Sequence, residues 1–250
     1  ENGGQAHYLA YFPFIKNLVE YSNIMDQYIT NINLSSQSAG ISGDEIFQIV
    51  DSLEGIFIPA HAFTPHKSFY GRSFKSYHEV FSDSQWDKIP AIELGLSADT
   101  YLADYLSELK EKTFLSNSDA HSLKKIAREY NIFQLKELNF NEFKMALEGK
   151  GKRRVKKNFG LDPRLGKYHR SYCPVCERSF TKEESVLICP ICGKENIIIG
   201  VKDRIIKISD RKKSISPEKR PEYIHQVPLF DVPRIGKKTY LKLLDSFGNE

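Results

Sequence analysis

The sequence predicts an α/β protein in which a parallel barrel of strands and helices precedes a small metal-binding module and a helical C-terminal segment. Short apolar runs alternate with stretches of helical spacing as far as Gly149, and polar residues repeatedly follow the apolar runs. Two Cys-x2-Cys pairs then follow, separated by twelve residues. An apolar pattern at helical spacing closes the chain at Thr239–Phe247.

Composition sets broad limits on the kind of protein. The 250 residues leave room for one large domain and a small one, and 40% hydrophobic with 27% charged residues is ordinary globular composition. Because no apolar run is long enough to span a membrane and no basic-then-apolar leader opens the chain, we expect a soluble, cytoplasmic protein. The net charge is only +4, but Lys and Arg cluster at 150–157 and recur to the end. This distribution favours a polyanionic partner, most simply nucleic acid, over a solvated charge run.

The first elements are a strand and two helices. Glu1–Gly4 is typical of a hairpin turn and leads into an apolar strand at Ala6–Phe14, but nothing precedes it to form the other arm. We therefore expect the chain to begin in mid-domain. Apolar residues at helical spacing predict a helix over Ile15–Tyr28, and a polar loop ending at Ser42 caps a second helix over Glu45–Leu53.

Three further strands each deliver a polar group at the C-terminal end. The run Gly55–Pro59 is short and apolar enough for a buried parallel strand, and His61 follows it. The next strand carries Glu93 among apolar neighbours, and a helix over Tyr101–Glu111 leads to a strand closed by Leu115. In a parallel α/β barrel the chemistry lies at this face.

Asp119 and His121 follow that last strand and form a candidate metal site. Residues two apart on an extended segment point to the same side, so a carboxylate and an imidazole converge there, as in many divalent-metal sites. The alternative is a helix N-terminus in which this segment caps a run beginning at Ser122. His61 and His7, at the ends of two other predicted strands, add two possible ligands.

The four cysteines predict a second, separate metal site. Cys173 and Cys176 form one pair, Cys189 and Cys192 the other, and such pairs place four thiolates tetrahedrally around Zn²⁺. Disulfides are the weaker interpretation for an intracellular protein. Four thiolates leave no open position for water, so this zinc would be structural.

The chain divides into four predicted parts: a barrel at 1–150, a basic connecting segment at 151–172, a zinc-binding module at 173–210 and a helical DNA-binding segment at 211–250. In the last part, Val232–Thr239 followed by an apolar helix is similar to a helix–hairpin–helix, whose tight loop and helix N-terminus grip phosphate. Lys237 and Lys238 add charge there, whereas Arg234 stands where the first glycine of such a loop is usual.

Several longer strings resemble the endonuclease Q family of the PHP superfamily. They are Pro59–Pro65, Ile92–Asp99, Leu115–Ser122, Gly160–His169, the two cysteine pairs, Gly200–Ile205, Arg220–Tyr223 and the C-terminal hairpin. Together these strings extend over essentially the whole chain. The resemblance implies a PHP-type distorted parallel barrel, and a DNA repair endonuclease that cuts 5′ to deaminated bases (uracil, hypoxanthine, xanthine) or abasic sites.

The resemblance also implies roles for individual residues of the barrel. His61, Asp119 and His121 would be metal ligands with His7 as a further one. We expect Asp119, His121 and, because of its position at a strand end, Glu93 to be catalytic. The carboxylate of Glu93 would face the metals or bond a flipped base, or it would only pair with a nearby Lys or Arg. The family's opening His-x-His strand and a further metal-binding Glu have no counterpart in the sequence, so we expect a barrel incomplete at its N-terminus.

DNA is the expected partner, with divalent ions (Zn²⁺, Mg²⁺ or Mn²⁺) in the barrel and Zn²⁺ at the cysteines. The expected nucleic-acid contacts are Arg164, Lys167, His169, Arg170, Arg204, Lys237 and Lys238. Two other functions stay open: a small-molecule phosphoesterase of the PHP type, and a non-catalytic DNA-binding fragment. His66, His78 and His225 have no partner in the sequence pattern and are taken as ordinary histidines.

Overall fold

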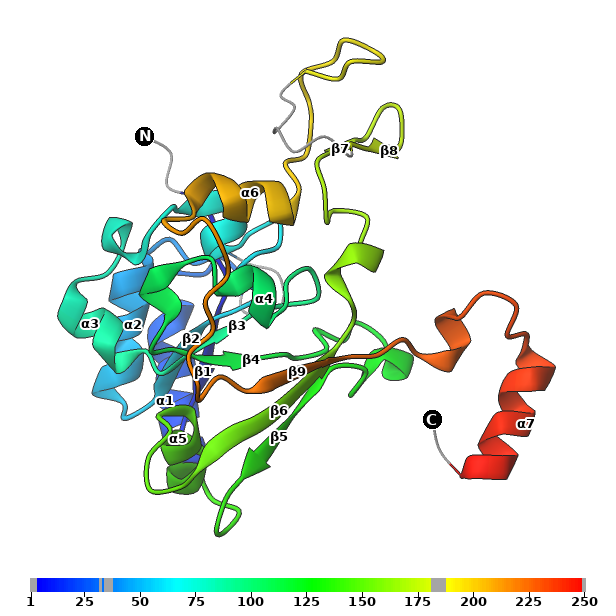
Figure 1. Ribbon diagram of the computed structural model, residues 1–250. Helices are drawn as coiled ribbons and strands as arrows, with labels where there is room; N and C mark the ends of the chain where they lie inside the picture. The colour runs from blue at the N-terminus through cyan, green and yellow to red at the C-terminus, as the bar shows by residue number, and fades with distance from the viewer. Residues whose placement is uncertain (1–3, 32, 34–37, 181–187, 249–250) are drawn as a thin grey trace.

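The computed structural model describes residues 4–31, 33, 38–180 and 188–248 of the chain, which form an α/β body with two smaller outlying parts (Figure 1). The first elements are β1 (Tyr8–Tyr11), α1 (Ile15–Asp26), α2 (Gly43–Ser52), β2 (Ile56–Pro59), the π-helix η1 (Phe69–Ser73), α3 (Asp83–Lys88), β3 (Ala91–Glu93), α4 (Thr100–Ala103) and β4 (Thr113–Leu115). The later ones are β5 (Tyr130–Gln134), α5 (Phe140–Leu147), β6 (Arg154–Gly160), β7 (Tyr172–Cys173), β8 (Arg178–Ser179), α6 (Val201–Ile208), β9 (Glu222–His225) and α7 (Lys237–Phe247).

The pairing of β1 with β2 is antiparallel, with Tyr8 opposite Pro59 and Tyr11 opposite Ile56. The interpretation of β2 as a parallel strand is therefore wrong for this neighbour. Two helices rather than one separate the strands, so the chain enters β2 from the opposite end. By contrast, β3 and β4 are parallel, with Glu93 opposite Leu115.

The third sheet joins segments from both halves of the chain. Strand β6 pairs with β5 in antiparallel fashion and with β9 in parallel fashion. The first half of the predicted connecting segment 151–172 thus belongs to one sheet with β5, which comes from the preceding part of the chain. Likewise α6, within 173–210, buries Val201 and Ile205 in the main core.

That core gathers apolar side chains from β2, β3, β4 and the loop around η1, with Phe63, Phe69, Tyr70 and Phe114 fully buried. The helix predicted over Tyr101–Glu111 is instead divided into α4 and a 3-10 turn. The division follows Asp104, whose buried carboxylate is bound from another part of the chain.

Two parts lie outside this body. The cysteine-bearing loops project from one side of the body, and α7 lies apart at the end of an extended stretch that continues from β9 (Figure 1). Gly236 caps α7, which begins two residues before the predicted helix, and the preceding Arg234 has a φ of +73°. No helix in the described ranges is both long and apolar enough to cross a membrane.

A buried ion pair ties the C-terminal half to the body. Arg220, 4% exposed, donates to both carboxylate oxygens of Asp104, which is fully buried, and Ser216 donates to the same carboxylate at 2.5 Å. The guanidinium also donates to the carbonyls of Leu109 and Lys112. Every hydrogen bond of this cluster joins residues more than one hundred positions apart.

Replacing Asp104→Ala should lower the free energy of unfolding by about 3–5 kcal/mol, because it leaves Arg220 buried without its counter-charge. The control Asp51→Ala breaks the exposed Lys88–Asp51 pair and should cost less than about 1 kcal/mol. Urea unfolding of both variants measures the difference. Equal losses would mean that the buried pair is not a principal tie.

Candidate active site

The ends of several strands meet at one edge of the body. The N–H groups of His61 and Ala62, just after β2, donate to the side chain and carbonyl of Glu93 at the end of β3. Gly160 ends β6 and Ser116 follows β4. A Cβ added to Gly160 would lie 2.8 Å from Oγ of Ser116, so the ends of β6 and β4 lie side by side. Polar residues that follow these strands therefore share one edge, as in parallel α/β folds.

His7 reaches the same edge from the other direction. It precedes β1 rather than ending it, so the predicted position at the end of a strand is wrong. Because β1 is antiparallel to β2, its first residues lie beside the end of β2, and the N–H of Ala60 donates to the carbonyl of His7 at 2.9 Å.

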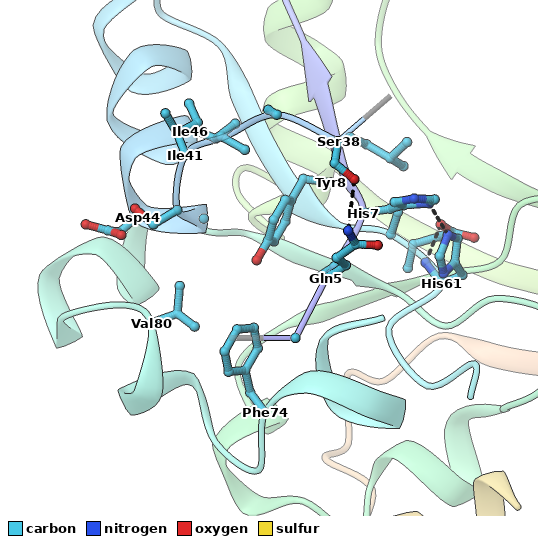
Figure 2. Close-up of a pocket in the computed structure, with 18 of the residues that line it drawn as sticks. Gln5, His7, Tyr8, Ser38, Ile41, Asp44, Ile46, His61, Phe74 and Val80 are labelled. Carbon is cyan, nitrogen blue, oxygen red and sulfur yellow. Dashed lines mark hydrogen bonds between the residues drawn. The ribbon is translucent and has the colours of Figure 1, made fainter. Parts of the chain in front are cut away.

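His7 and His61 are in direct contact. Nδ1 of His7 lies 2.9 Å from Nε2 of His61, and Figure 2 shows the two imidazoles facing each other. Nδ1 of His61 lies 3.1 Å from Oγ1 of Thr64, which orients the ring. Two nitrogens bound to one tetrahedral ion at about 2.0–2.1 Å lie about 3.3 Å apart, so a small movement would let both rings hold the same cation.

Asp119 faces the same space. A cavity of about 940 Å³ is lined by both histidines, Glu93, Asn117 and Asp119. Burial lowers the pKa of His61, and the negative charge of Asp119 opposes this shift, as it does for His7. The backbone φ is +29° at His61 and +44° at Asp119, a strained region that is enriched at functional sites.

His121 does not join this group. Its Nδ1 lies 2.7 Å from the carbonyl oxygen of Asp119, and the ring is exposed and outside the lining of the cavity. The alternative prediction is that this segment caps a helix beginning at Ser122. The structure has only a 3-10 turn there, at Leu123–Lys125, and no side chain caps it. The structure thus brings His7, His61 and Asp119 to one cavity and leaves His121 beside it.

Glu93 is 3% exposed and forms no ion pair with a described Lys or Arg, in contrast to the structural alternative for this residue. Its Oε2 accepts the N–H of His61 at 2.7 Å, while Oε1 is buried without a hydrogen-bond partner. Burial raises the pKa of Glu93 to about 7, against the lowering effect of the His61 N–H, and Asp119 raises it further. Glu93 thus lines the same cavity as the two imidazoles with one carboxylate oxygen unpartnered, a suitable environment for a cation.

The four cysteines form a compact cluster. Their sulfur atoms all lie within 4.8 Å of one another, with Cys173 3.7 Å from Cys192 and Cys176 3.8 Å from Cys189. Four sulfurs around Zn²⁺ at about 2.3 Å lie about 3.8 Å apart, so the donor set fits the ion. No disulfide joins them, and within the described ranges this is the only group of three or more potential ligands so closely spaced.

Two of the basic residues expected to contact DNA are engaged inside the protein. Arg204 donates to the carbonyls of Tyr70 and Phe74 at 2.9 Å each. Arg170 pairs with the buried carboxylate of Asp203 at 2.8 Å. These contacts give both guanidinium groups a structural role.

The other expected contacts lie closer to solvent. Arg164 is exposed and forms a bidentate pair with Asp162, while Lys167 lies 4.3 Å from the ring centre of Tyr172. His169 is half-buried, and burial lowers its pKa. Lys237 and Lys238, in the first turn of α7, are exposed, and α7 lies apart from β1 and β2 in Figure 1.

One pair at this edge was not predicted. Nε2 of His225, at the end of β9, lies 3.0 Å from the carboxylate of Asp99, which also caps α4 by accepting the N–H of Leu102. The two residues are 126 positions apart, so only the parallel pairing of β9 with β6 brings them together. The sequence pattern gives His225 no partner, so it contains no signal for this pair.

Without added divalent metal, Glu93→Gln should change how stability depends on pH. The folded protein keeps the carboxyl proton up to about pH 7, whereas the unfolded chain releases it near 4.5, so wild-type stability falls across this window. Relative to wild type, the variant should gain about 3 kcal/mol between pH 4 and pH 8. Urea unfolding at both pH values measures this gain, with exposed Glu20→Gln as a control that follows wild type. A constant difference across the window would contradict the raised pKa.

No family model matches the chain. It is 44% identical over 248 residues to YqxK, an uncharacterised protein of Bacillus subtilis, an alignment that covers 99% of this chain and 62% of YqxK. An uncharacterised protein of Methanocaldococcus jannaschii is 37% identical over 202 residues, which are 76% of this chain and 24% of that protein.

Two solved structures match the fold closely. The crystal structure of the lesion-specific endonuclease PfuEndoQ from Pyrococcus furiosus superposes with a TM-score of 0.84 and 35% identity, covering 98% of this chain and 64% of that one. A crystal structure of endonuclease Q with a 27-mer duplex carrying an abasic lesion at its active site superposes with a TM-score of 0.85 and 34% identity. This match covers 98% of this chain and 65% of that one. The chain thus spans just under two thirds of the length of these proteins. The resemblance to the endonuclease Q family is thus confirmed over almost all residues of the chain.

Proposed function

We propose that this protein is a DNA repair endonuclease that hydrolyses the phosphodiester bond 5′ to a deaminated base or an abasic site with metal-activated water. The observation that carries the proposal is the match of 98% of the chain to endonuclease Q, including a complex with abasic duplex DNA. The grouping of His7, His61, Glu93 and Asp119 at one cavity supports it independently.

The residue types gathered at this cavity suit a divalent ion. His7 and His61 would supply imidazole nitrogens and Asp119 a carboxylate oxygen, a donor set that first-row metals accept. When bound there, such an ion supplies a Lewis acid and a water of lowered pKa. Glu93 fixes the backbone of His61 by accepting its N–H, and its other carboxylate oxygen has no hydrogen-bond partner.

The proposal includes two features of the fold, a PHP-type barrel and a helix–hairpin–helix. The body corresponds to part of a PHP-type barrel, in which β1 and β2 form one antiparallel pair and the strand ends form the active-site edge. The C-terminal segment acts as the second half of a helix–hairpin–helix. Arg234 supports that reading because its φ of +73° is the left-handed conformation that glycine adopts more easily at such a loop.

Zinc at the cysteine cluster is proposed as a structural ion. The N–H groups of Cys176 and Cys192 donate to the sulfurs of Cys173 and Cys189, at 3.4 and 3.5 Å, an arrangement that favours thiolates. The hydroxyl of Ser179, between the two cysteine pairs, donates to the carbonyl of Lys167. The module would thus hold the exposed stretch Arg164–Lys167 in shape for contact with the DNA backbone.

Asp119→Asn should abolish nicking of a duplex with an abasic site, because the amide keeps the shape but loses the charge that holds the cation. We expect a loss on the order of 100-fold or more in the cleavage rate, with DNA affinity nearly unchanged. Gel assays of cleavage and filter binding of the same duplex measure both. Exposed Asp26→Asn is the matched control.

Nicking that survives in Asp119→Asn would remove the nuclease assignment from this cavity. Hydrolysis of a chromogenic phosphate monoester, without duplex cleavage by wild type, would favour the small-molecule phosphoesterase instead. Both assays need the same divalent ions, so they are run side by side.

Cys189→Ser should reduce bound zinc from about one ion per chain to nearly none, because one of four thiolates is lost. The loss should also unfold the region around the cysteines, seen as faster proteolysis there than in wild type. The control Ile191→Ala changes an exposed side chain between the same ligands and should retain the ion. Full zinc retention by the serine variant would exclude the four-thiolate site.

A further inference from the structure

A second cavity, of about 860 Å³, adjoins the candidate metal site. It shares His7, His61 and Asp119 with the first cavity. Its remaining wall comes mostly from the loop between β2 and the end of η1, and includes Lys67 and Arg72. The cavity therefore lies between the candidate metal ligands and a pair of cationic side chains.

The charge of this wall is not neutralised. Lys67 and Arg72 are both exposed, and none of the acidic residues in the described ranges lies within ion-pair distance of either. Asp119 is the one acidic residue that lines the cavity. The positive charge of Lys67 reaches the metal site, since it contributes to the lowered pKa of His7.

The loop that carries these cations is held rigidly. Phe69 and Tyr70 are fully buried, and the N–H groups of Tyr70 and Gly71 both donate to the carbonyl of Ala62, at 2.8 and 3.0 Å. A Cβ at Gly71 would overlap the carbonyl oxygen of Thr64, so the chain passes too closely there for a larger residue.

Two further contacts fix the ends of the loop. Arg204 donates to the carbonyls of Tyr70 and Phe74 and so holds η1 from α6. The N–H of His7 donates to the carbonyl of Lys67 at 3.1 Å, where the backbone has a φ of +46°. His7, just before β1, and the cationic loop are thus joined directly, and packing against the core fixes the backbone that carries Lys67 and Arg72.

We propose that Lys67 and Arg72 bind a phosphate group of the substrate in this second cavity, beside the metal site. A guanidinium and an ammonium directed at one space without a counter-ion are suited to a phosphate. That the phosphate belongs to a DNA strand rests on the proposed function. It would be the scissile phosphate or its neighbour, because the same cavity contains His7, His61 and Asp119.

The path of the strand away from this phosphate is also indicated. The ring of His66, next to Lys67, contacts the ring of Tyr168 with centroids 5.5 Å apart. Tyr168 follows Lys167, one of the exposed basic residues expected to contact DNA. A strand that leaves the cavity on this side passes onto that basic stretch, with contacts to the backbone rather than to the bases.

The test compares Lys67→Gln and Arg72→Gln with Lys75→Gln, which removes an exposed charge from the same region but outside the cavity. Affinity for a duplex with an abasic-site analogue is measured over a NaCl series without added divalent metal. In Lys67→Gln and in Arg72→Gln, the two cavity variants, the negative slope of log affinity against log salt should become less steep by about 0.9. Binding should also be several-fold weaker at low salt. Lys75→Gln should match wild type, and unchanged melting temperatures confirm that all three variants fold.

The outcomes separate this inference from the nuclease proposal. Duplex binding with an unchanged slope in both cavity variants overturns the phosphate site but leaves the nuclease proposal intact, and an equal effect of Lys75→Gln also overturns it. If wild type binds no duplex, calorimetry with inorganic pyrophosphate decides. If wild type binds pyrophosphate and the variants Lys67→Gln and Arg72→Gln do not, the phosphate site stands and DNA is rejected as its ligand. If wild type does not bind pyrophosphate either, both the phosphate site and the nuclease proposal are overturned.

Discussion

The antiparallel pairing of β1 with β2 is the constraint on which the candidate active site depends. With this pairing, the first residues of β1 lie at the end of β2, and His7 meets His61 at 2.9 Å. A parallel arrangement would move His7 to the other end of a four-residue strand, about 13 Å away at about 3.3 Å per residue. His7 also holds the loop after β2, because its N–H donates to the carbonyl of Lys67.

The site is built at a cost to the stability of the fold. Glu93 is buried with one oxygen unpartnered, and a buried polar atom without a partner costs about 1–3 kcal/mol. His61 and Asp119 both have a positive φ. Such features are tolerated where a ligand compensates for them, and a cation between the imidazoles and the carboxylates would do so. The large core below the site and the Asp104–Arg220 pair supply the stability that the edge lacks.

Sequence reasoning identified the residues that depend on local pattern. The cysteine spacing predicted a cluster that the structure confirms, and strand-end positions predicted that His61 and Asp119 share a cavity. The direction of β1, the break after α4 and the Asp99–His225 pair depend on contacts between distant segments, which no local pattern contains. The orientation of His121 was not predicted either. Residues two apart point to the same side only where the backbone is extended, and the backbone at Asp119 has a φ of +44° instead.

Arg204 shows most clearly how function is shared between the two halves of the chain. The basic side chain led to the prediction of a phosphate contact, yet it donates to two carbonyls of the loop around η1. Because α6 is buried against the main core, the chain beyond the cysteines returns to shape the second cavity. Arg204 therefore stabilises the backbone from which Arg72 extends, and the C-terminal half helps to build the wall of the second cavity.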